Sequence, residues 1–147
     1  MNTLHSIVRG RETWTINPQM TVLEAAEFMA DKRIGAAPVV EGNRLIGVFS
    51  ERDLMTRVVV AGRAPAETLI SEVMTSEVVT CHPGENHTEA MRRMQHARCR
   101  HLPVVEDGQL LGFVSLRDLL QNEIEEKNEE LRFMNEYLHS MPASQGS

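Results

Sequence analysis

Two short motifs hold the residues of this chain that are best suited to binding chemistry. Each places a serine three residues before an aspartate: Ser50 with Asp53, and Ser115 with Asp118. Where a strand turns into a helix, free backbone N–H groups and a partial positive charge form a natural phosphate site. The aspartate there could accept hydrogen bonds from two neighbouring ribose hydroxyls. An arginine before each aspartate adds charge and fork geometry for phosphate; these are Arg52 and Arg117.

The same spacing also has a purely local interpretation. Serine is a good N-cap residue and aspartate is favourable in the first helical turn, so the pair stabilises a helix start by about 1 kcal/mol. Because such pairs are common, neither motif alone distinguishes a binding site from a helix cap. What surrounds the motifs has to decide between the two.

An internal repeat surrounds both motifs. Residues 15–55 reappear as residues 80–120 at a fixed offset of 65, and 16 of the 41 aligned pairs are identical. The chain is therefore one supersecondary unit used twice, and a site in one copy should have a counterpart in the other. Each copy would be marginally stable alone, so we expect one to bury apolar surface against the other.

The residue pattern predicts the order β-α-β-β-α in each copy, and hence an α/β (α+β) fold. A short strand at 13–16 or 78–81 precedes a helix that begins after Thr21 or Asn86, where Thr21 and Glu24 form a capping box. Two strands follow, at 36–40 and 45–49 or 101–105 and 110–114, and a second helix begins at each serine. The predicted divisions are a first repeat with its N-terminal segment (1–62), a linker with a short helix (63–75), a second repeat (76–122) and a helical extension with a tail (123–147).

The last helix differs between the copies. In the first copy it should stop near Gly62, whereas no glycine or proline interrupts the second from Leu116 to about Leu138. Apolar residues at seven-residue spacing there fit either a short coiled coil or a helix packed on its own domain. These residues are Ile124, Leu131 and Leu138, with Leu120, Met134 and Met141 three beyond seam positions.

Composition and charge exclude several classes of protein. A net charge of −6 argues against a protein that coats nucleic acid. We expect neither a secretory leader nor a membrane helix, because no apolar run approaches about 18 residues. Cys81 and Cys99 lack the spacing of a disulfide framework or zinc site, which favours a reduced, cytoplasmic protein with no bound metal. We also expect no enzyme activity, since the chain lacks a nucleophile–base pair and a glycine-rich phosphate loop.

Three features together resemble the CBS domain, and the tandem copies resemble the CBS pair, or Bateman module. They are the duplicated unit, the Pro-Val-Val strands at Pro38 and Pro103, and the endings Gly47–Asp53 and Gly112–Asp118. Met74 and Thr75 also look like the family's usual lead-in to a copy. The resemblance covers residues from about 10 to 122. Segments 50–53 and 62–63, with the long acidic terminal helix, are similar to single-module bacterial CBS proteins that have no attached enzyme.

The resemblance implies two copies packed about a pseudo-twofold axis, with clefts that bind AMP, ADP, ATP, NAD or S-adenosylmethionine as regulatory ligands. In the family, the aspartate holds the ribose, the serine lies near ribose or phosphate, and residues before the Pro-Val-Val strand border the base or phosphate. The end of the first strand lines the base side. The nucleotide-binding residues implied are Thr15, Ile16, Asn17, Ala36, Ala37, Pro38, Ser50, Arg52 and Asp53, and Thr80, Cys81, His82, Arg100, His101, Leu102, Pro103, Ser115, Arg117 and Asp118.

The two copies differ where the Pro-Val-Val strand begins. Arg100 and His101 stand where the first copy has Gly35 and Ala36, so the second site is expected to bind an AMP-like ligand better. The resemblance also implies a homodimer through the repeat helices, to which the C-terminal helix could contribute, and a regulated protein partner of unknown identity. AMP, ADP or ATP are the favoured ligands; the alternatives are NAD(H) or S-adenosylmethionine at the same clefts, or a protein-interaction or dimerisation module that binds no ligand.

Overall fold

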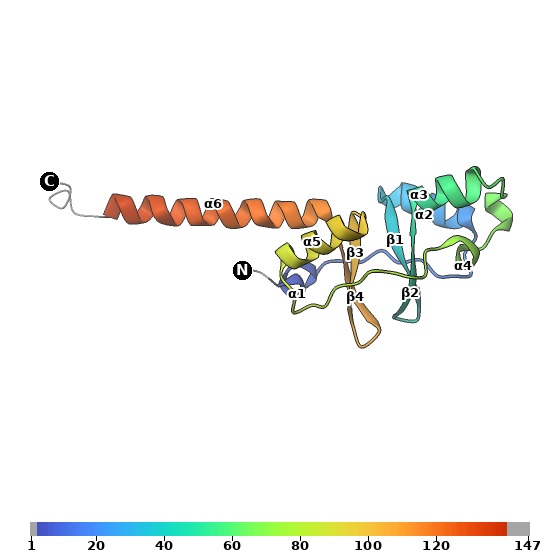
Figure 1. The fold of residues 1–147 in the computed structure, drawn as a ribbon, viewed down its shortest axis with the longest axis horizontal. Helices are drawn as coiled ribbons and strands as arrows, with labels where there is room; N and C mark the ends of the chain where they lie inside the picture. The colour runs from blue at the N-terminus through green and yellow to red at the C-terminus, as the bar shows by residue number, and fades with distance from the viewer. Residues whose placement is uncertain (1–2, 141–147) are drawn as a thin grey trace.

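The structure is a computed structural model that describes residues 3–140 of the chain. Its two halves repeat one order of elements, with β1 and β2 in one half and β3 and β4 in the other (Figure 1). This confirms the mixed α/β fold expected from the repeat. The elements are α1 (Leu4–Val8), α2 (Val22–Lys32), β1 (Ala36–Glu41), β2 (Arg44–Ser50), α3 (Glu51–Asp53), the π-helix η1 (Leu54–Val59), the 3₁₀-helix η2 (Pro65–Glu67), α4 (Ile70–Val73), α5 (His87–Ala97), β3 (His101–Glu106), β4 (Gln109–Ser115) and α6 (Leu116–Ser140).

Helices α2 and α5 are matched in length and in the way they start and end. Each has 11 residues and ends at an arginine with left-handed backbone, Arg33 or Arg98. Thr21 and Glu24 form the predicted capping box, and Asn86 caps α5 by accepting a hydrogen bond from the N–H of Glu89. The caps fix where each helix begins, and the buried residues at equivalent positions, Ala25 and Met29 or Ala90 and Met94, mark the face that each turns toward its core.

The four strands form one antiparallel sheet in the order β1-β2-β4-β3. Its two hairpins meet only at their turns, where Arg44 of β2 pairs with Gln109 of β4. The N–H of Leu45 donates to the carbonyl of Gly108 at 3.2 Å, and the N–H of Leu110 donates to the carbonyl of Asn43 at 2.9 Å. These two bonds join equivalent residues with the copies exchanged, as a pseudo-twofold axis between the hairpins requires.

The short strands predicted at 13–16 and 78–81 are reduced to single parallel bridges, from Ile16 to Val39 and from Cys81 to Val104. Ile16 donates to Pro38 and accepts from Val40, and the pairing goes no further. In a parallel ladder the next donor would be two residues on, where Pro18 and Pro83 have no N–H. Proline therefore ends each strand after one bridge.

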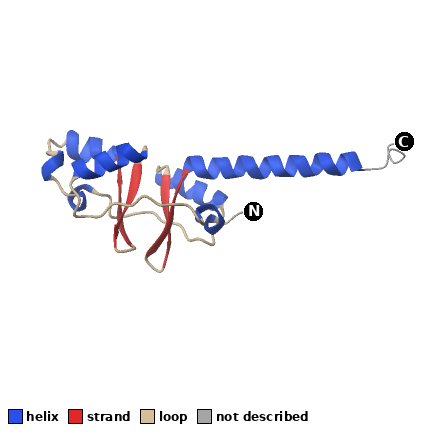
Figure 2. Ribbon diagram, turned by 180° about the vertical axis from the view of Figure 1, so that it is seen from behind, coloured by secondary structure: helices blue, strands red, loops and turns tan. Residues whose placement is uncertain are grey.

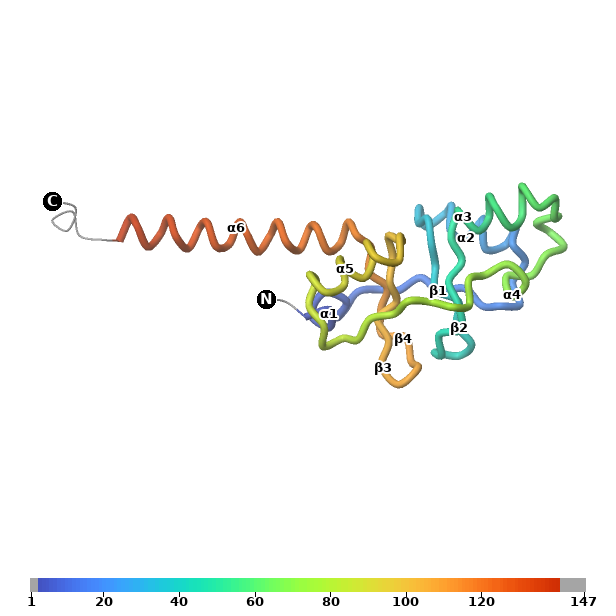
Figure 3. The backbone as a smooth tube through the Cα atoms, in the orientation of Figure 1, coloured from blue at the N-terminus to red at the C-terminus, as the bar shows by residue number. Residues whose placement is uncertain are grey.

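The two halves exchange their lead-in helices (Figure 3). Helix α4, which precedes the second copy, adds Ile70 and Val73 to the hydrophobic core of the first. Helix α1, which precedes the first copy, adds Leu4 and Val8 to the core of the second. The structure thus has two cores, each completed by a segment of the other half, rather than one core between the copies.

Close approach of these lead-in segments requires glycine in β2 and β4. A Cβ atom at Gly47 would lie 2.7 Å from the Met74 sulfur and 2.9 Å from the Thr75 carbonyl oxygen. A Cβ atom at Gly112 would lie 2.6 Å from Cβ of Val8. No side chain fits at these distances. The two equivalent glycines therefore allow the lead-in segments to pass close to β2 and β4, beside the serine–aspartate motifs.

Helix α6 extends far beyond the rest of the fold (Figures 1 and 2). Its first turns pack on the second core through Leu119, which is fully buried, but every residue from Lys127 to Ser140 is exposed. Packing on its own domain therefore accounts only for the base of the helix. Met141, the last residue of the apolar spacing, lies outside the described residues. Within 3–140, no helix has the length and apolar character needed to cross a membrane.

Candidate functional site

Both serine–aspartate motifs form reciprocal helix caps. In the second copy the N–H of Ser115 donates to Asp118 Oδ2 at 2.9 Å, and the N–H of Asp118 donates to Ser115 Oγ at 3.0 Å. In the first copy the bonds between Ser50 and Asp53 measure 2.9 and 3.3 Å. The local interpretation of the motifs is therefore right in both copies. The cap occupies one carboxylate oxygen of each aspartate. Whether a ligand can bind the aspartate therefore depends on what contacts the other oxygen.

In the first copy the carboxylate of Asp53 is fully engaged. Its Oδ1 accepts a hydrogen bond from the Thr75 hydroxyl at 3.2 Å and lies 3.6 Å from Nε of Arg57. The hydroxyl of Ser50 also donates to Oδ2, at 3.1 Å. The Asp53 side chain is only 10% exposed. A ribose hydroxyl would therefore have to displace an existing partner.

In the second copy the carboxylate of Asp118 keeps one oxygen open. Nη2 of Arg11 donates to Oδ2 at 3.1 Å, and the Asp118 side chain is 29% exposed. Among residues 3–140, no hydrogen bond reaches Oδ1. Burial alone would raise the pKa of Asp118, but hydrogen bonds from Ser115 and Arg11 and the charge of Arg11 outweigh it and lower the pKa. The aspartate stays ionised with one acceptor available.

The strand starts bring further predicted residues beside the motifs. Ala36 pairs with Ser50 in the first hairpin, and His101 pairs with Ser115 in the second. The His101 ring stacks on Phe113 with 5.3 Å between ring centres. Burial lowers the pKa of His101, opposed by the nearby carboxylates of Asp118 and Glu51 and assisted by Arg100. His101 is consequently neutral at pH 7 and close to charges of both copies.

Glu51 gives the first site a charge opposite to that of the second. It is the first residue of α3, and a Cβ atom at Gly35 would lie 3.0 Å from its Oε1. Any side chain at position 35 would meet this carboxylate. The second copy has Leu116 and Arg100 at the equivalent positions. At these two positions the first copy therefore carries one anion, Glu51, and the second carries one cation, Arg100.

The remaining predicted residues form the framework of the two sites. Ile16, Cys81, Ala37 and Leu102 are buried in the cores. Burial, assisted by Glu85, raises the pKa of Cys81 to about 12, so its thiol is unreactive. The carbonyls of Pro38 and Pro103 accept hydrogen bonds from the two bridge residues. Backbone groups alone could reach a ligand from these positions.

The polar predicted residues are placed differently from one another. Thr15 and Thr80 are half-buried, whereas Arg52, Arg100 and Arg117 are exposed. Asn17 and His82 are exposed and accept hydrogen bonds from backbone N–H groups of the turns that follow them, at 2.9 Å from Gln19 and 3.0 Å from Gly84. These two side chains shape the turns.

Four residues beside the aspartates were not among the predicted site residues: Arg11, Glu51, Arg57 and Thr75. Arg11 and Thr75 lie outside the 41 aligned pairs, so the repeat could not single them out. Glu51 opposite Leu116 was a visible difference between the copies, and a signal of unequal charge. Thr75 belongs to the Met74-Thr75 lead-in, which the sequence did mark.

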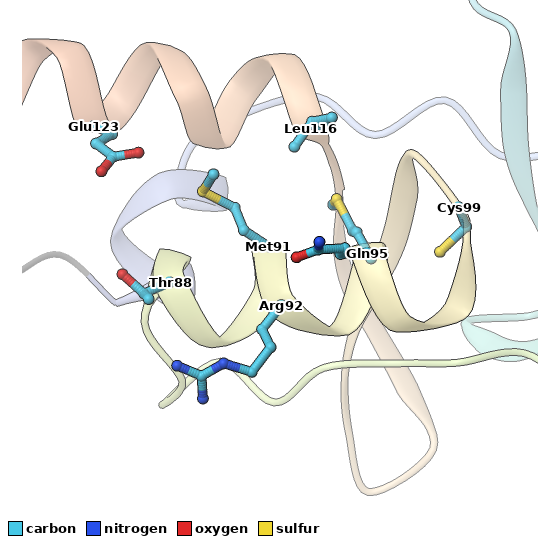
Figure 4. Close-up of a pocket in the computed structure, with 8 residues that line it drawn as sticks. Thr88, Met91, Arg92, Gln95, Cys99, Leu116 and Glu123 are labelled. Atoms are coloured by element: carbon cyan, nitrogen blue, oxygen red, sulfur yellow. The ribbon is translucent and has the colours of Figure 1, made fainter.

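A groove lies elsewhere, between α5 and α6 (Figure 4), with a volume of about 510 Å³. It contains none of the predicted site residues. No cluster of three or more potential metal ligands is found among residues 3–140. The groove is lined by Thr88, Met91, Arg92, Met94, Gln95, Cys99, Leu116 and Glu123.

Two segments of the chain, residues 8–60 and 70–125, match the family model of the CBS domain. The chain belongs to the CBS-domain family. It is 37% identical over 110 residues to the CBS domain-containing protein YhcV of Bacillus subtilis, covering 75% of this chain and 78% of YhcV. The exchanged lead-in helices and central sheet are thus those of a tandem CBS pair.

Solved structures of CBS proteins share this fold. One with CBS domains from Burkholderia ambifaria is 35% identical, has a TM-score of 0.78, and covers 84% of this chain and 95% of its own. CBSX2, solved in complex with AMP, has a TM-score of 0.75 at 23% identity and covers 86% of this chain and 99% of its own. At that identity the likeness to CBSX2 establishes the fold alone.

Proposed function

We propose that this CBS pair is a regulatory module that binds an adenosine-containing nucleotide, AMP, ADP or ATP, at the second site. The second site is defined as Ser115 and Asp118 with Arg11, Arg100 and His101. The observation that carries the proposal is the open Oδ1 of an ionised Asp118 beside Arg11. The AMP complex of CBSX2, a protein of the same fold, supports this choice of ligand class.

Each part of a nucleotide has a suitable group at the second site. The carboxylate of Asp118 accepts hydrogen bonds from ribose hydroxyls, and the start of α6 with Arg100 favours the phosphate. His101, stacked on Phe113, offers a flat apolar surface beside them. NAD and S-adenosylmethionine share the adenosine part, so they are the alternative ligands of this site. A ligand regulates only if it binds one arrangement of the copies more tightly than another.

Calorimetric titration of the full chain with AMP, ADP, ATP, NAD and S-adenosylmethionine tests the proposal. We expect at least one of the three adenine nucleotides to bind with a dissociation constant well below 1 mM. The same ligand should raise the melting temperature, because it binds the folded state alone. If none of the five binds below millimolar concentration, the sensor function is wrong.

The exposed part of α6 favours a second candidate function, an interaction module. Ile124, Leu131 and Leu138 are 54%, 57% and 61% exposed and share the seven-residue spacing of a coiled-coil seam. Among the described residues, the stretch 127–140 packs on nothing in its own domain. An isolated helix of this length is marginal in water, so a second copy of the chain packing along it would stabilise it. This would contribute to a homodimer, alone or together with the repeat helices, and could present a surface to a regulated partner.

Truncation after Asn122 separates the two functions. We expect the truncated chain to bind nucleotide as before and to self-associate more weakly, as measured by sedimentation equilibrium. An unchanged mass in solution would show that α6 is not a dimer seam. If the full-length chain self-associates but binds no nucleotide, the ligand-free interaction module is favoured instead.

A further inference from the structure

We propose that Arg11, which lies outside both repeats, binds the phosphate of the nucleotide at the second site. This inference rests on the proposed nucleotide binding and adds to it a residue that makes the affinity depend on ligand charge. The second site is then assembled from three segments: the start of β3, the start of α6, and the chain that follows α1.

Arg11 is held at the second copy by the helix before it. The N–H groups of Leu4 and His5 donate to the carbonyls of Glu85 and Pro83, at 2.8 and 2.9 Å. Val8 packs against Gly112, and the N–H of Arg11 donates to the carbonyl of Val8 at 3.0 Å. The backbone of Arg11 is therefore tied to the second copy, although the sequence separates it from Asp118 by 107 positions.

The contact with Asp118 leaves both partners able to bind more. The ion pair uses Nη2 of Arg11 and Oδ2 of Asp118, at 3.1 Å. The Arg11 side chain is 43% exposed, and a guanidinium carries five N–H donors in a planar fork. A ribose can therefore take Oδ1 while Arg11 stays in place. The 5′-phosphate is joined to the ribose ring through C5′ and an ester oxygen, which keeps it within reach of a long arginine side chain paired with the ribose-holding carboxylate.

At the first site the arginine near the aspartate is committed to backbone carbonyls as well as to the carboxylate. Thr75 contacts Asp53 there with a neutral hydroxyl. Arg57 is nearby, but its Nη1 donates to the carbonyls of Met74 and Val73 at 2.9 and 3.4 Å. Its guanidinium thus fastens the lead-in segment. Dependence on phosphate should consequently belong to the second site.

The opposite role for Arg11 would be to block the site, by occupying the carboxylate of Asp118 until a ligand displaces it. In that case its removal would free Asp118 and tighten the binding of every adenosine compound. A phosphate-binding arginine affects only the ligands that carry phosphate. Comparing AMP with adenosine, which differ by the phosphate alone, distinguishes these two roles.

The experiment titrates AMP and adenosine into the full-length wild-type chain and into Arg11→Ala, Arg11→Lys and Arg9→Ala. Arg9 is the matched control, because it is exposed, precedes Arg11 by two positions, and makes no side-chain hydrogen bond or ion pair within residues 3–140. We expect Arg11→Ala to weaken AMP binding about tenfold or more, the loss of one charge-assisted contact, and to change adenosine binding less than twofold. Arg11→Lys should fall between, since it keeps charge but loses the fork, and Arg9→Ala should match the wild type.

Three results would overturn the inference. Tighter binding of both ligands to Arg11→Ala would show that Arg11 blocks the site. An unchanged ratio of AMP affinity to adenosine affinity would show that Arg11 does not bind the phosphate, although the chain binds nucleotide. If the wild-type chain binds neither compound, the proposed function itself fails and this inference with it. The melting temperature of each variant checks that the fold is retained.

Discussion

The two candidate sites share a framework and differ in charge. Ser50 and Asp53 form the same reciprocal cap as Ser115 and Asp118, beside strands paired in the same register. Yet Asp53 is buried with both oxygens engaged, whereas Asp118 is partly exposed with one oxygen open. Duplication therefore copied the geometry of a helix start, while the residues around it give the two carboxylates different partners and different exposure.

The largest expected effect comes from changing the two aspartates separately. Asp118→Asn keeps an oxygen for the cap but loses the charge that we propose holds the ribose hydroxyls. We expect it to weaken AMP binding between tenfold and hundredfold, which corresponds to about 1.5–3 kcal/mol for hydrogen bonds to a charged group. Asp53→Asn, the matched variant, should leave AMP affinity within about twofold and instead lower the free energy of unfolding. Calorimetry and denaturant unfolding measure the two effects.

Equal losses of affinity from the two variants would mean that both sites bind AMP alike. A loss from Asp53→Asn alone would reverse the assignment of the sites.

A smaller effect is expected from removing the anion of the first site. Glu51→Gln keeps the size of the side chain and removes the charge that faces the start of α3. We expect AMP affinity at the first site to rise about fivefold, because a like charge near 4 Å costs about 1 kcal/mol in a water-like environment. The measurement uses Asp118→Asn as background, which weakens the second site, and a gain that arises at the first site should disappear when Asp53→Asn is added.

Glu67→Gln is the control for Glu51→Gln, since it removes the same charge from the exposed η2 helix. If both variants raise the residual affinity equally, net charge rather than the position of Glu51 is responsible. If neither does, the engaged carboxylate of Asp53 is what closes the first site.

The smallest expected effect is a pH dependence that only the second site has. Because burial holds the pKa of His101 below its ordinary value of 6.5, the residue is neutral near pH 7. A bound phosphate would favour the protonated ring, so protons are taken up on binding and AMP affinity should rise as the pH falls. We expect a two- to threefold gain from pH 7.5 to 6 beyond that of His101→Gln, on the order expected for one histidine.

Comparison with His101→Gln is necessary because the AMP phosphate also titrates, with a second pKa near 6. Its contribution is the same for both proteins, so the difference isolates His101. Identical pH profiles would remove His101 from the site. In the ligand-free protein, the lowered pKa of His101 makes its contribution to the free energy of unfolding depend on pH. That contribution is complete above about pH 6.5 and is lost as the pH falls.

Much of the fold could be predicted from the sequence because its signals are local or repeated. The capping box at Thr21 and Glu24 fixed the start of α2, and the uninterrupted run after Leu116 indicated the long α6. The first strands were predicted too long, although Pro18 and Pro83 carry the reason they end. Local patterns are readable because their partners lie a few residues away.

What the sequence did not reveal depends on contacts between distant segments. The exchange of α1 and α4 gives each copy its own core, whereas the repeat alone suggested that the copies bury surface against each other. The same exchange brings Arg11 to Asp118 and Thr75 to Asp53. These partners stand outside the repeated block, so no spacing rule connects them with the motifs they complete.

The central claim, that the second site is the one that binds nucleotide, is tested most directly by a crystal structure of the full chain grown with AMP in excess. We expect AMP beside Asp118, with ribose hydroxyls within hydrogen-bond distance of its Oδ1 and the phosphate on the side of Arg11. Ordered AMP beside Asp53 in crystals whose second site is empty would contradict it.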